Sequence, residues 1–197
     1  KIAFKDLKRL DRLISDISSS SRLEVELAKG EFDIIDIRDI LKSVMEVTKT
    51  NVTKRMNVDI NLKLPKNKIE TLGIGDRIAQ VFYNLIDNAL SFSKEGSTID
   101  IIATTTEGEA IVKIKDQGPG IPKENLGRIF ERFYTYRPEE KSFGNNSGLG
   151  LSICKQIIKS LNGTIIANNR LEGGSVFTVT LPLNKDRKRK KWLVLLS

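Results

Sequence analysis

The chain has 197 residues, of which 39% are hydrophobic and 29% are charged, a composition typical of a globular protein large enough to bury one core. The formal net charge is +8, and the sequence contains one cysteine and no histidine. One cysteine excludes a disulfide framework within the chain, and the lack of histidine limits the catalysis that the polypeptide can perform alone. No segment approaches the roughly 20 apolar residues of a membrane span, and no signal peptide opens the sequence, so we expect a cytoplasmic domain.

The N-terminal segment, residues 1–30, has the pattern of one long helix of the coiled-coil type. Apolar residues recur at alternating steps of three and four, with charged residues on the flanks. A single helix would expose this stripe to water, so the pattern predicts a partner helix from another chain or from an upstream segment. Gly30 favours a helix stop. The stripe consists of Leu7, Leu10, Ile14, Ile17 and Ser21.

Residues 31–183 mix helical and strand patterns, which predicts an α+β domain. Strands with period-two alternation and amphipathic helices follow one another without an internal repeat, as in a two-layer sandwich with helices on one face of a mixed sheet. The predicted helices are 36–49, 76–92 and 148–161, and the predicted strands are 58–64, 68–72, 99–104, 110–115, 164–168 and 175–181.

The C-terminal segment, residues 184–197, carries much of the positive charge. Its part KDRKRKK holds six basic residues and one acidic residue. Aromatic residues are not interleaved with the basic ones, so nucleic-acid binding is not expected. A solvated, disordered tail is the favoured interpretation. The final WLVLLS leaves a membrane-surface anchor or a shifted reading frame as open alternatives.

Two asparagines on the predicted helix 76–92 form the first candidate for chemistry. Asn84 and Asn88 are four residues apart and therefore share a face. Buried carboxamides without partners cost about 1–3 kcal/mol each. A divalent cation that bridges phosphate oxygens would supply partners, because Mg²⁺ prefers oxygen ligands. Taken alone, the pair is more readily explained as ordinary helix-surface asparagines.

An Asp-x-Gly-x-Gly loop follows the strand 110–115. Asp116 stands at the strand end, where a carboxylate can accept a hydrogen bond from an exocyclic amine. Gly118 and Gly120 would let the backbone approach a flat ring closely. As a lone motif this loop is weak, because Asp-Gly combinations also mark ordinary turns.

The segment RIFERFYT gathers Phe130, Phe133 and Tyr134 around Arg132. It is interpreted either as a hydrophobic box that hinges a mobile loop or as plain core, with equal weight. The polar segment 135–146 that follows is rich in helix-breaking residues, as expected of a lid over a nucleotide.

The segment NNSGLGLSICKQII places Ser147, Gly148 and Gly150 at the start of a predicted helix. Free backbone N–H groups and the helix dipole at such a start form a phosphate site. The segment is neither a Walker loop nor a dinucleotide fingerprint. Cys154 lies in the same apolar helix and is interpreted as an inert buried thiol, because a nucleophilic thiol would need a base.

The order of these four elements resembles the N, G1, F and G2 boxes of the GHKL superfamily. Within it, the chain is similar to the catalytic ATP-binding domain of bacterial sensor histidine kinases, from about Phe32 to Leu183. The resemblance implies the two-layer GHKL (Bergerat) fold with ATP and Mg²⁺ as cofactors. Residues 1–30 resemble the second helix of the dimerisation and histidine-phosphotransfer hairpin. The segments RLDRLISDISSSSRLEVEL and NLIDNALSFS are most similar to the ChvG/ExoS type.

The resemblance also implies roles for individual residues. Asn88 would bind Mg²⁺, with Asn84 beside it at the phosphates. Phe92 would stack on the adenine, and Asp116 would accept a hydrogen bond from its amino group. The remaining implied nucleotide contacts are Lys94, Gly118, Gly120, Ile121, Tyr134, Ser147, Gly148, Leu149 and Gly150.

Other implied roles are less direct. Arg132 or Arg137 would contact the γ-phosphate, and the choice between them stays open. Residues 173–175 match the last glycine box of the family and would shape the floor of the site. Two positions depart from the family, because Ser91 stands where lysine is frequent and Asn146 where glycine is usual. The first departure weakens the phosphate contact at Ser91 or transfers it to Lys94.

The implied activity is that of a protein-histidine kinase that transfers the ATP γ-phosphoryl group to a histidine for relay to a response regulator. That histidine is absent from the sequence, so the chain is expected not to phosphorylate itself. The implied partners are a second copy of the kinase, bound through residues 1–30, and the receiver domain of a response regulator. The resemblance places the full-length protein in the inner membrane through segments upstream of this sequence.

Two rival functions remain. A GHKL ATPase of the gyrase, Hsp90 or MutL sort would activate water with a glutamate on the N-box helix, but Asn84 occupies the position aligned with it. A nucleotide-gated dimerisation module without catalysis is the non-enzymatic alternative. Phosphate release, compared with transfer to a histidine-bearing partner, separates the three.

Overall fold

The computed structural model describes residues 32–48, 57–135 and 148–184. The predicted N-terminal helix, nearly all of the predicted lid and the basic tail lie outside these residues. Among the described helices, none is both long enough and apolar enough to cross a membrane.

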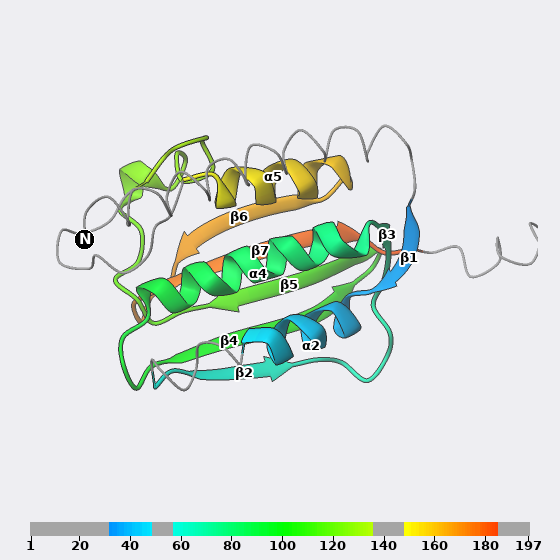
Figure 1. The fold of residues 1–197 in the computed structure, drawn as a ribbon, viewed down its shortest axis with the longest axis horizontal. Coiled ribbons are helices and arrows are strands. Elements are labelled where there is room, and N and C mark those ends of the chain that lie inside the picture. The colour runs from blue at the N-terminus through cyan, green and yellow to red at the C-terminus, as the bar shows by residue number, and fades with distance from the viewer. Residues whose placement is uncertain (1–31, 49–56, 136–147, 185–197) are drawn as a thin grey trace, which may run out of the picture.

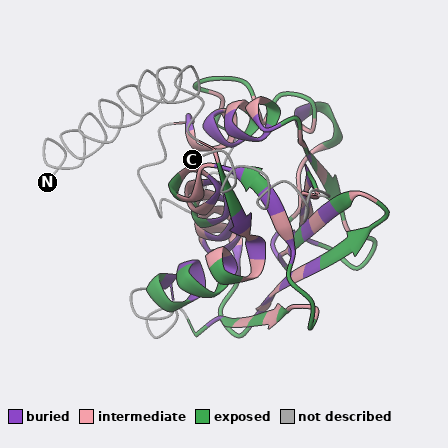
Figure 2. Ribbon diagram, turned by 90° about the vertical axis from the view of Figure 1, so that its right-hand side faces the viewer, coloured by how far each residue is buried: buried purple, intermediate pink, exposed green. Residues whose placement is uncertain are grey.

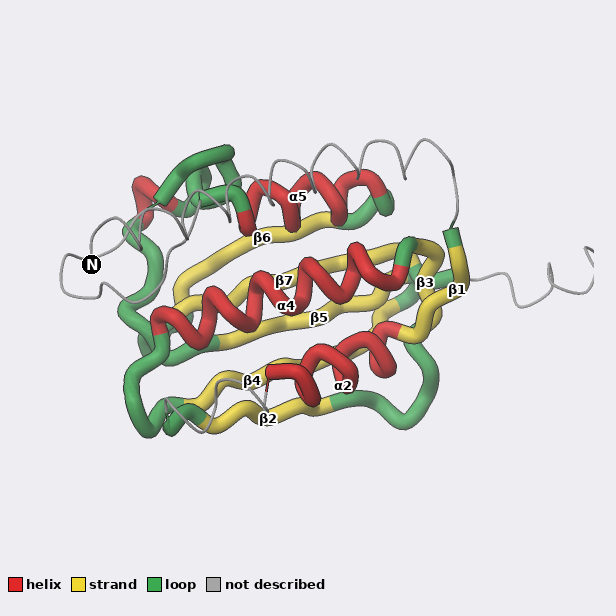
Figure 3. Tube along the Cα trace, viewed as in Figure 1, coloured by secondary structure: helices red, strands yellow, loops and turns green. Residues whose placement is uncertain are grey.

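Three helices lie on one face of a five-stranded mixed sheet (Figures 1 and 3). The strand order is β2-β4-β5-β7-β6, in which β2 and β4 are parallel and the other neighbours are antiparallel. A separate two-stranded ribbon pairs β1 with β3. The helices are α2 (Ile37–Thr48), α4 (Gly75–Phe92) and α5 (Gly150–Ser160), with a short 3₁₀ helix η2 (Lys123–Asn125). The strands are β1 (Asp33–Asp36), β2 (Asp59–Lys63), β3 (Glu70–Gly73), β4 (Thr98–Thr106), β5 (Glu109–Lys115), β6 (Thr164–Asn169) and β7 (Ser175–Pro182).

The core lies between the helices and the sheet, where Figure 2 shows the buried residues. Every second residue of the central strands faces the helices, because side chains alternate across a strand. The helices contribute apolar stripes at helical spacing, and full burial of each such side chain stabilises the fold by about 1.5–3 kcal/mol. The central strands bury Ile99, Ile101, Ala103, Ala110, Val112, Ile114, Phe177, Val179 and Leu181, and α4 buries Ile78, Val81, Phe82, Leu85, Ile86, Ala89 and Leu90.

The predicted α+β two-layer fold is confirmed, with local differences in the elements. Helix α5 begins at Gly150 rather than at Gly148, because Gly148 has a φ of +75°, outside the helical region. Strand β1 was not predicted. It has only four residues and is held by pairing with β3, a contact between segments far apart in the sequence.

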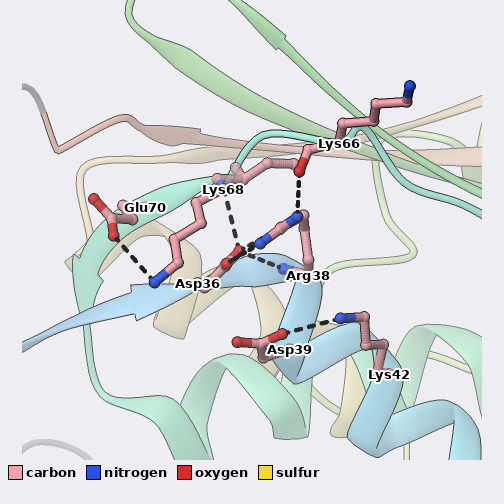
Figure 4. A network of polar contacts seen from close by, with 8 residues as sticks. Asp36, Arg38, Asp39, Lys42, Lys66, Lys68 and Glu70 are labelled. Carbon is pink, nitrogen blue, oxygen red and sulfur yellow. Dashed lines mark hydrogen bonds and ion pairs between the residues drawn. The ribbon is translucent and has the colours of Figure 1, made fainter.

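A clasp at the junction of β1 and α2 fixes the start of the described domain (Figure 4). Oδ1 of Asp36 accepts hydrogen bonds from the backbone N–H of Arg38 at 3.1 Å and of Ile69 at 3.2 Å. Oδ2 pairs with Nη2 of Arg38 at 2.7 Å, and Nη1 of Arg38 donates to the carbonyl of Lys66 at 2.7 Å. The clasp therefore joins the first strand and helix to the segment that leads into β3.

The clasp changes the titration of both partners. Burial opposes ionisation of Asp36, but the hydrogen bonds from Arg38 and Ile69 and the charge of Arg38 together outweigh it, so the pKa of the Asp36 carboxyl is lowered. The hydrogen bond to Asp36 raises the pKa of the Arg38 guanidinium. Because the pKa of Asp36 is lower in the folded than in the unfolded chain, its stabilisation is present above the unfolded pKa and is lost as the pH falls through the folded pKa.

Asp36→Ala is expected to lower the free energy of unfolding by about 1–3 kcal/mol at neutral pH, because Ile69 N–H and Arg38 lose their acceptor. The difference from wild type should shrink as the pH falls below the ordinary range of an aspartate carboxyl and Asp36 becomes protonated. Urea unfolding over a series of pH values from neutral to acidic measures this. The matched control is Asp39→Ala, which removes the exposed ion pair with Lys42 (3.2 Å) but no hydrogen bond of the clasp. Equal losses in the two variants, or a gap that does not depend on pH, would contradict the role of the clasp.

Candidate functional site

The predicted site residues come from segments that meet beside helix α4. The loop after β5 contacts the C-terminal end of α4, because a Cβ atom added to Gly118 would lie 2.9 Å from the carbonyl oxygen of Phe92. Two turns earlier on α4, Nδ2 of Asn84 lies 3.5 Å from the carbonyl oxygen of Gly150, at the start of α5. The structure thus brings three of the four predicted elements together along one helix.

Asp116 is the most deeply buried polar residue of the site, with 4% of its surface exposed. Its Oδ1 accepts hydrogen bonds from the backbone N–H of Gly118 at 2.8 Å and of Ser175 at 3.1 Å. Its Oδ2 accepts from the Ser175 hydroxyl. The backbone N–H of Asp116 in turn donates to the Ser175 carbonyl at 3.0 Å, which extends the pairing of β5 with β7. The strand ends hold the carboxylate rigidly at the base of the loop.

Two glycines allow the loop and the β6–β7 turn to approach each other. A Cβ atom on Gly174 would lie 2.1 Å from the carbonyl oxygen of Asp116, and Gly174 has a φ of +89°. A Cβ atom on Gly120, whose φ is +79°, would lie 2.9 Å from Oδ1 of Asn169. Gly174 therefore requires glycine for space as well as for backbone conformation, whereas Gly120 requires it for backbone conformation, because the Asn169 side chain could move.

Sequence reasoning missed the side chains of Asn169 and Arg170. The Asn169 carboxamide donates to the carbonyl of Ile121 at 2.6 Å and accepts from its N–H at 2.7 Å. Nη1 of Arg170 donates to the Asp116 carbonyl at 2.7 Å. Their partners are 48 and 54 residues away in the sequence, and no local pattern indicates such contacts.

The start of α5 forms the other end of the site. The Leu149 carbonyl accepts the first helical hydrogen bond, from Ile153 at 2.9 Å, so the N–H groups of the first turn have no partner within the helix. Asn88 lies one turn beyond Asn84 on α4, and among the described residues none donates to or accepts from its carboxamide. Carboxamides and helix N–H groups together suit phosphate oxygens and a hydrated divalent cation.

Cys154 is fully buried between α5 and α4. Its thiol donates a long hydrogen bond to the Val81 carbonyl at 3.7 Å. Burial raises the pKa of this thiol to about 12, and a hydrogen bond with Asn84 lowers it by a smaller amount. The thiol is therefore protonated at neutral pH, in agreement with the predicted inert role.

The predicted aromatic box divides between core and surface. The ring of Phe130 packs edge-on against Phe177, with centroids 6.3 Å apart, and the Lys155 ammonium lies 5.8 Å from its centroid. Phe133 is 61% exposed and has a φ of +64°. Its N–H donates to the Gly148 carbonyl at 3.0 Å, so the box is fastened to the segment before α5.

The remaining predicted contacts are placed less closely. Tyr134 is covered by the guanidinium of Arg128, 4.8 Å from its ring centroid. Lys94 and Arg132 are exposed. Ser147 and Arg137 lie outside the described residues.

A comparison with protein families matches residues 73–185 to the histidine kinase-, DNA gyrase B- and HSP90-like ATPases. The chain belongs to this family of ATPases. The resemblance to the GHKL superfamily that the four boxes predict is therefore confirmed.

Curated relatives from this family are bacterial sensor proteins. The chain is 40% identical over 200 residues to the sensor protein ChvG of Agrobacterium fabrum, covering 96% of this chain and 34% of that protein. It is 40% identical over 189 residues to ChvG of Rhizobium meliloti, covering 90% and 33%. The sensor protein SrrB of Staphylococcus aureus is 32% identical over 92% of this chain. The chain spans about a third of the length of these relatives. It resembles the ChvG type, as its sequence segments predict.

Solved structures of the family share the fold. The catalytic domain of histidine kinase ThkA superposes with a TM-score of 0.69 at 28% identity, covering 78% of this chain and 98% of that one. The histidine kinase AdeS of Acinetobacter baumannii superposes with a TM-score of 0.69 at 25% identity, covering 94% and 86%. A complex of ThkA with the response regulator protein TrrA has a TM-score of 0.66 at 26% identity, with 87% of this chain and 50% of that chain covered.

The adjacent glycines Gly173 and Gly174 give a matched test of the close approach at Asp116. Gly174→Ala is expected to lower the free energy of unfolding by about 3 kcal/mol or more, because its methyl group would overlap the Asp116 carbonyl. Gly173→Ala should cost only about 1–2 kcal/mol, because Gly173 has a φ of +91° but nothing within 4 Å of an added Cβ. Denaturant unfolding measures both, and equal losses would show that the approach is not tight.

Proposed function

We propose that the chain is the ATP-binding catalytic core of a two-component sensor histidine kinase. One observation carries the proposal: the buried Asp116 carboxylate and the start of α5 both lie beside α4. The chain also belongs to the histidine kinase-like ATPases. Phe92 and Asn84 lie about 12 Å apart along the α4 axis, at 1.5 Å per residue. This distance is similar to the distance between the base and the phosphates of one bound nucleotide.

At the base end, Asp116 accepts a hydrogen bond from the amino group of adenine. Both of its oxygens already accept hydrogen bonds from the protein, which fixes the direction of the carboxylate. Phe92 stacks on the ring, and Gly118, Gly120 and Ile121 line its edge. Guanine presents a carbonyl where adenine presents its amino group, so Asp116 disfavours it.

At the phosphate end, the first turn of α5 binds phosphate oxygens through its N–H groups. Asn88 would hold Mg²⁺ through its carboxamide oxygen, with Asn84 beside it, because oxygen is the ligand atom that Mg²⁺ prefers. When bound, Mg²⁺ would neutralise part of the negative charge on the phosphates. Within the described residues no group of three or more His, Cys, Asp or Glu side chains could hold a metal alone.

Transfer is favoured over hydrolysis by what stands beside the phosphates. Water would need a general base, and the Asn84 carboxamide cannot accept a proton at neutral pH. Phosphoryl transfer requires mainly positioning and charge neutralisation from the protein. The sequence has no histidine, so the acceptor belongs to another segment or chain. The candidates for the γ-phosphate contact remain Arg132, which is exposed, and Arg137, which lies outside the described residues.

The partners follow from the same proposal. Residues 1–30 lie outside the described residues, and their resemblance to the second helix of a dimerisation hairpin supports a second kinase chain as a partner. A response regulator receives the phosphoryl group, as the complex of ThkA with TrrA supports by similarity. The full-length protein is anchored in the membrane by segments beyond this sequence, and this part faces the cytoplasm.

Asn88→Ala is expected to abolish most of the Mg²⁺-dependent gain in ATP affinity while leaving the metal-free affinity nearly unchanged. The wild-type affinity should fall in the micromolar range, roughly −7 to −8 kcal/mol. Calorimetry with ATP, with and without Mg²⁺, measures the two parts. The control is Asn61→Ala, which removes an exposed carboxamide bonded to Asp100 on the outer side of the sheet. A folded wild type that binds no nucleotide would refute the proposal.

Radiolabel from γ-labelled ATP should not remain on this chain, because no histidine can accept it. It should pass to an added histidine-bearing dimerisation helix of a ChvG-type kinase, with little free phosphate released. Gels run under alkaline conditions preserve phosphohistidine and show the labelled partner. Rapid phosphate release without transfer would instead indicate an ATPase, and nucleotide binding without either would indicate a dimerisation module.

A further inference from the structure

The last residue of β6 clamps the loop that follows β5. Oδ1 of Asn169 accepts from the N–H of Ile121 at 2.7 Å, and Nδ2 donates to the carbonyl of the same residue at 2.6 Å. One carboxamide thus satisfies both backbone groups of Ile121, as a neighbouring strand would. Gly120 makes room for this contact, since a Cβ atom there would lie 2.9 Å from Oδ1 of Asn169.

The next residue fixes the other end of the loop. Nη1 of Arg170 donates to the carbonyl of Asp116 at 2.7 Å, and Nη2 pairs with Glu172 at 3.0 Å. The Arg170 backbone N–H donates to the Gly174 carbonyl at 3.0 Å, so the residue itself is held by the β6–β7 turn. With 17% of its side chain exposed, Arg170 is largely packed in this position.

We propose that Asn169 and Arg170 are positioning residues that hold the loop 116–121 in its adenine-selective shape. This inference rests on the proposed nucleotide site. Between the two anchors stand Gly118 and Gly120, which are the residues with the most backbone freedom to lose on ordering. Contacts from outside such a loop help to pre-organise it, and here Asn169, the last residue of β6, and Arg170, the next residue, supply them at the two ends.

The sheet itself does not need these side chains. Asn169 is already paired with Ser175 through the backbone register of β6 and β7, and its side chain is exposed. Removing its carboxamide leaves that register in place. The expected consequence is a change in base recognition at constant fold, with no change at the phosphate end.

The test is a set of NMR titrations of the ¹⁵N-labelled chain with Mg²⁺ and ADP, GDP or pyrophosphate. Asn169→Ala should weaken ADP binding about tenfold, equal to about 1.4 kcal/mol. The preference for ADP over GDP should fall by a similar factor. The shifts that pyrophosphate causes at the Gly148 and Gly150 amides should stay as in wild type. Hydrogen exchange at the Ile121 amide should become faster.

Control and conservative variants separate positioning from general damage. Asn168→Ala, one residue earlier on the opposite face of β6, should bind like wild type. Glu172→Ala removes the ion pair of Arg170 but not its bond to Asp116, and should also bind like wild type. Arg170→Ala should reduce the preference for ADP, and Arg170→Lys should restore part of it. Asn169→Asp keeps the shape but places an oxygen against the Ile121 carbonyl, and should lose at least as much preference as the alanine variant.

The outcomes distinguish this inference from the proposed function. A wild type that shows no shifts with ADP would refute the nucleotide site itself. A wild type that prefers ADP, with Asn169 and Arg170 variants that keep the same preference, would refute the positioning role alone. Equal weakening of ADP, GDP and pyrophosphate would also refute it, because it would show a loss of fold rather than of base recognition.

Discussion

The buried carboxylate of Asp116 is the contact on which the candidate site depends. It accepts hydrogen bonds from Gly118, from the Ser175 N–H and from the Ser175 hydroxyl, at the point where β5 ends and β7 begins. Burying a carboxylate without hydrogen-bond partners at this depth would be costly, so the surrounding donors are a condition for placing Asp116 here. The sheet register that aligns Asp116 with Ser175 is therefore also the register that forms the base end of the site.

The other parts of the site are arranged around that fixed point. Because Gly174 has no side chain, the β6–β7 turn can approach the Asp116 backbone. The side chain of Arg170, at the start of that turn, donates a hydrogen bond to the Asp116 carbonyl. Gly118 presses the same loop onto the end of α4. Helix α4 runs from this loop to the proposed phosphate end, where Asn84 contacts Gly150, the first residue of α5. A sheet edge and a helix thus define the two ends of the proposed nucleotide site.

The sequence predicts much of this arrangement, because its strongest signals are local. Period-two and helical spacing indicated most strands and all three described helices, and the box order indicated which ones carry the site. The contacts of Asn169 and Arg170 could not be predicted in this way, because two polar residues at a strand end form no local pattern that indicates which distant residues they contact. The aromatic box was ambiguous for the same reason, because only packing against Phe177 and Gly148 separates Phe130 from the exposed Phe133.

The account's central claim is that the base end is built by the sheet before any nucleotide arrives. Amide hydrogen exchange of the nucleotide-free chain tests it most directly, at the N–H groups of Gly118 and Ser175 that donate to Asp116. The account predicts protection close to that of the β5–β7 ladder, with little further slowing when ADP is added. Exchange as fast as in an exposed loop, slowed only by the nucleotide, would contradict it.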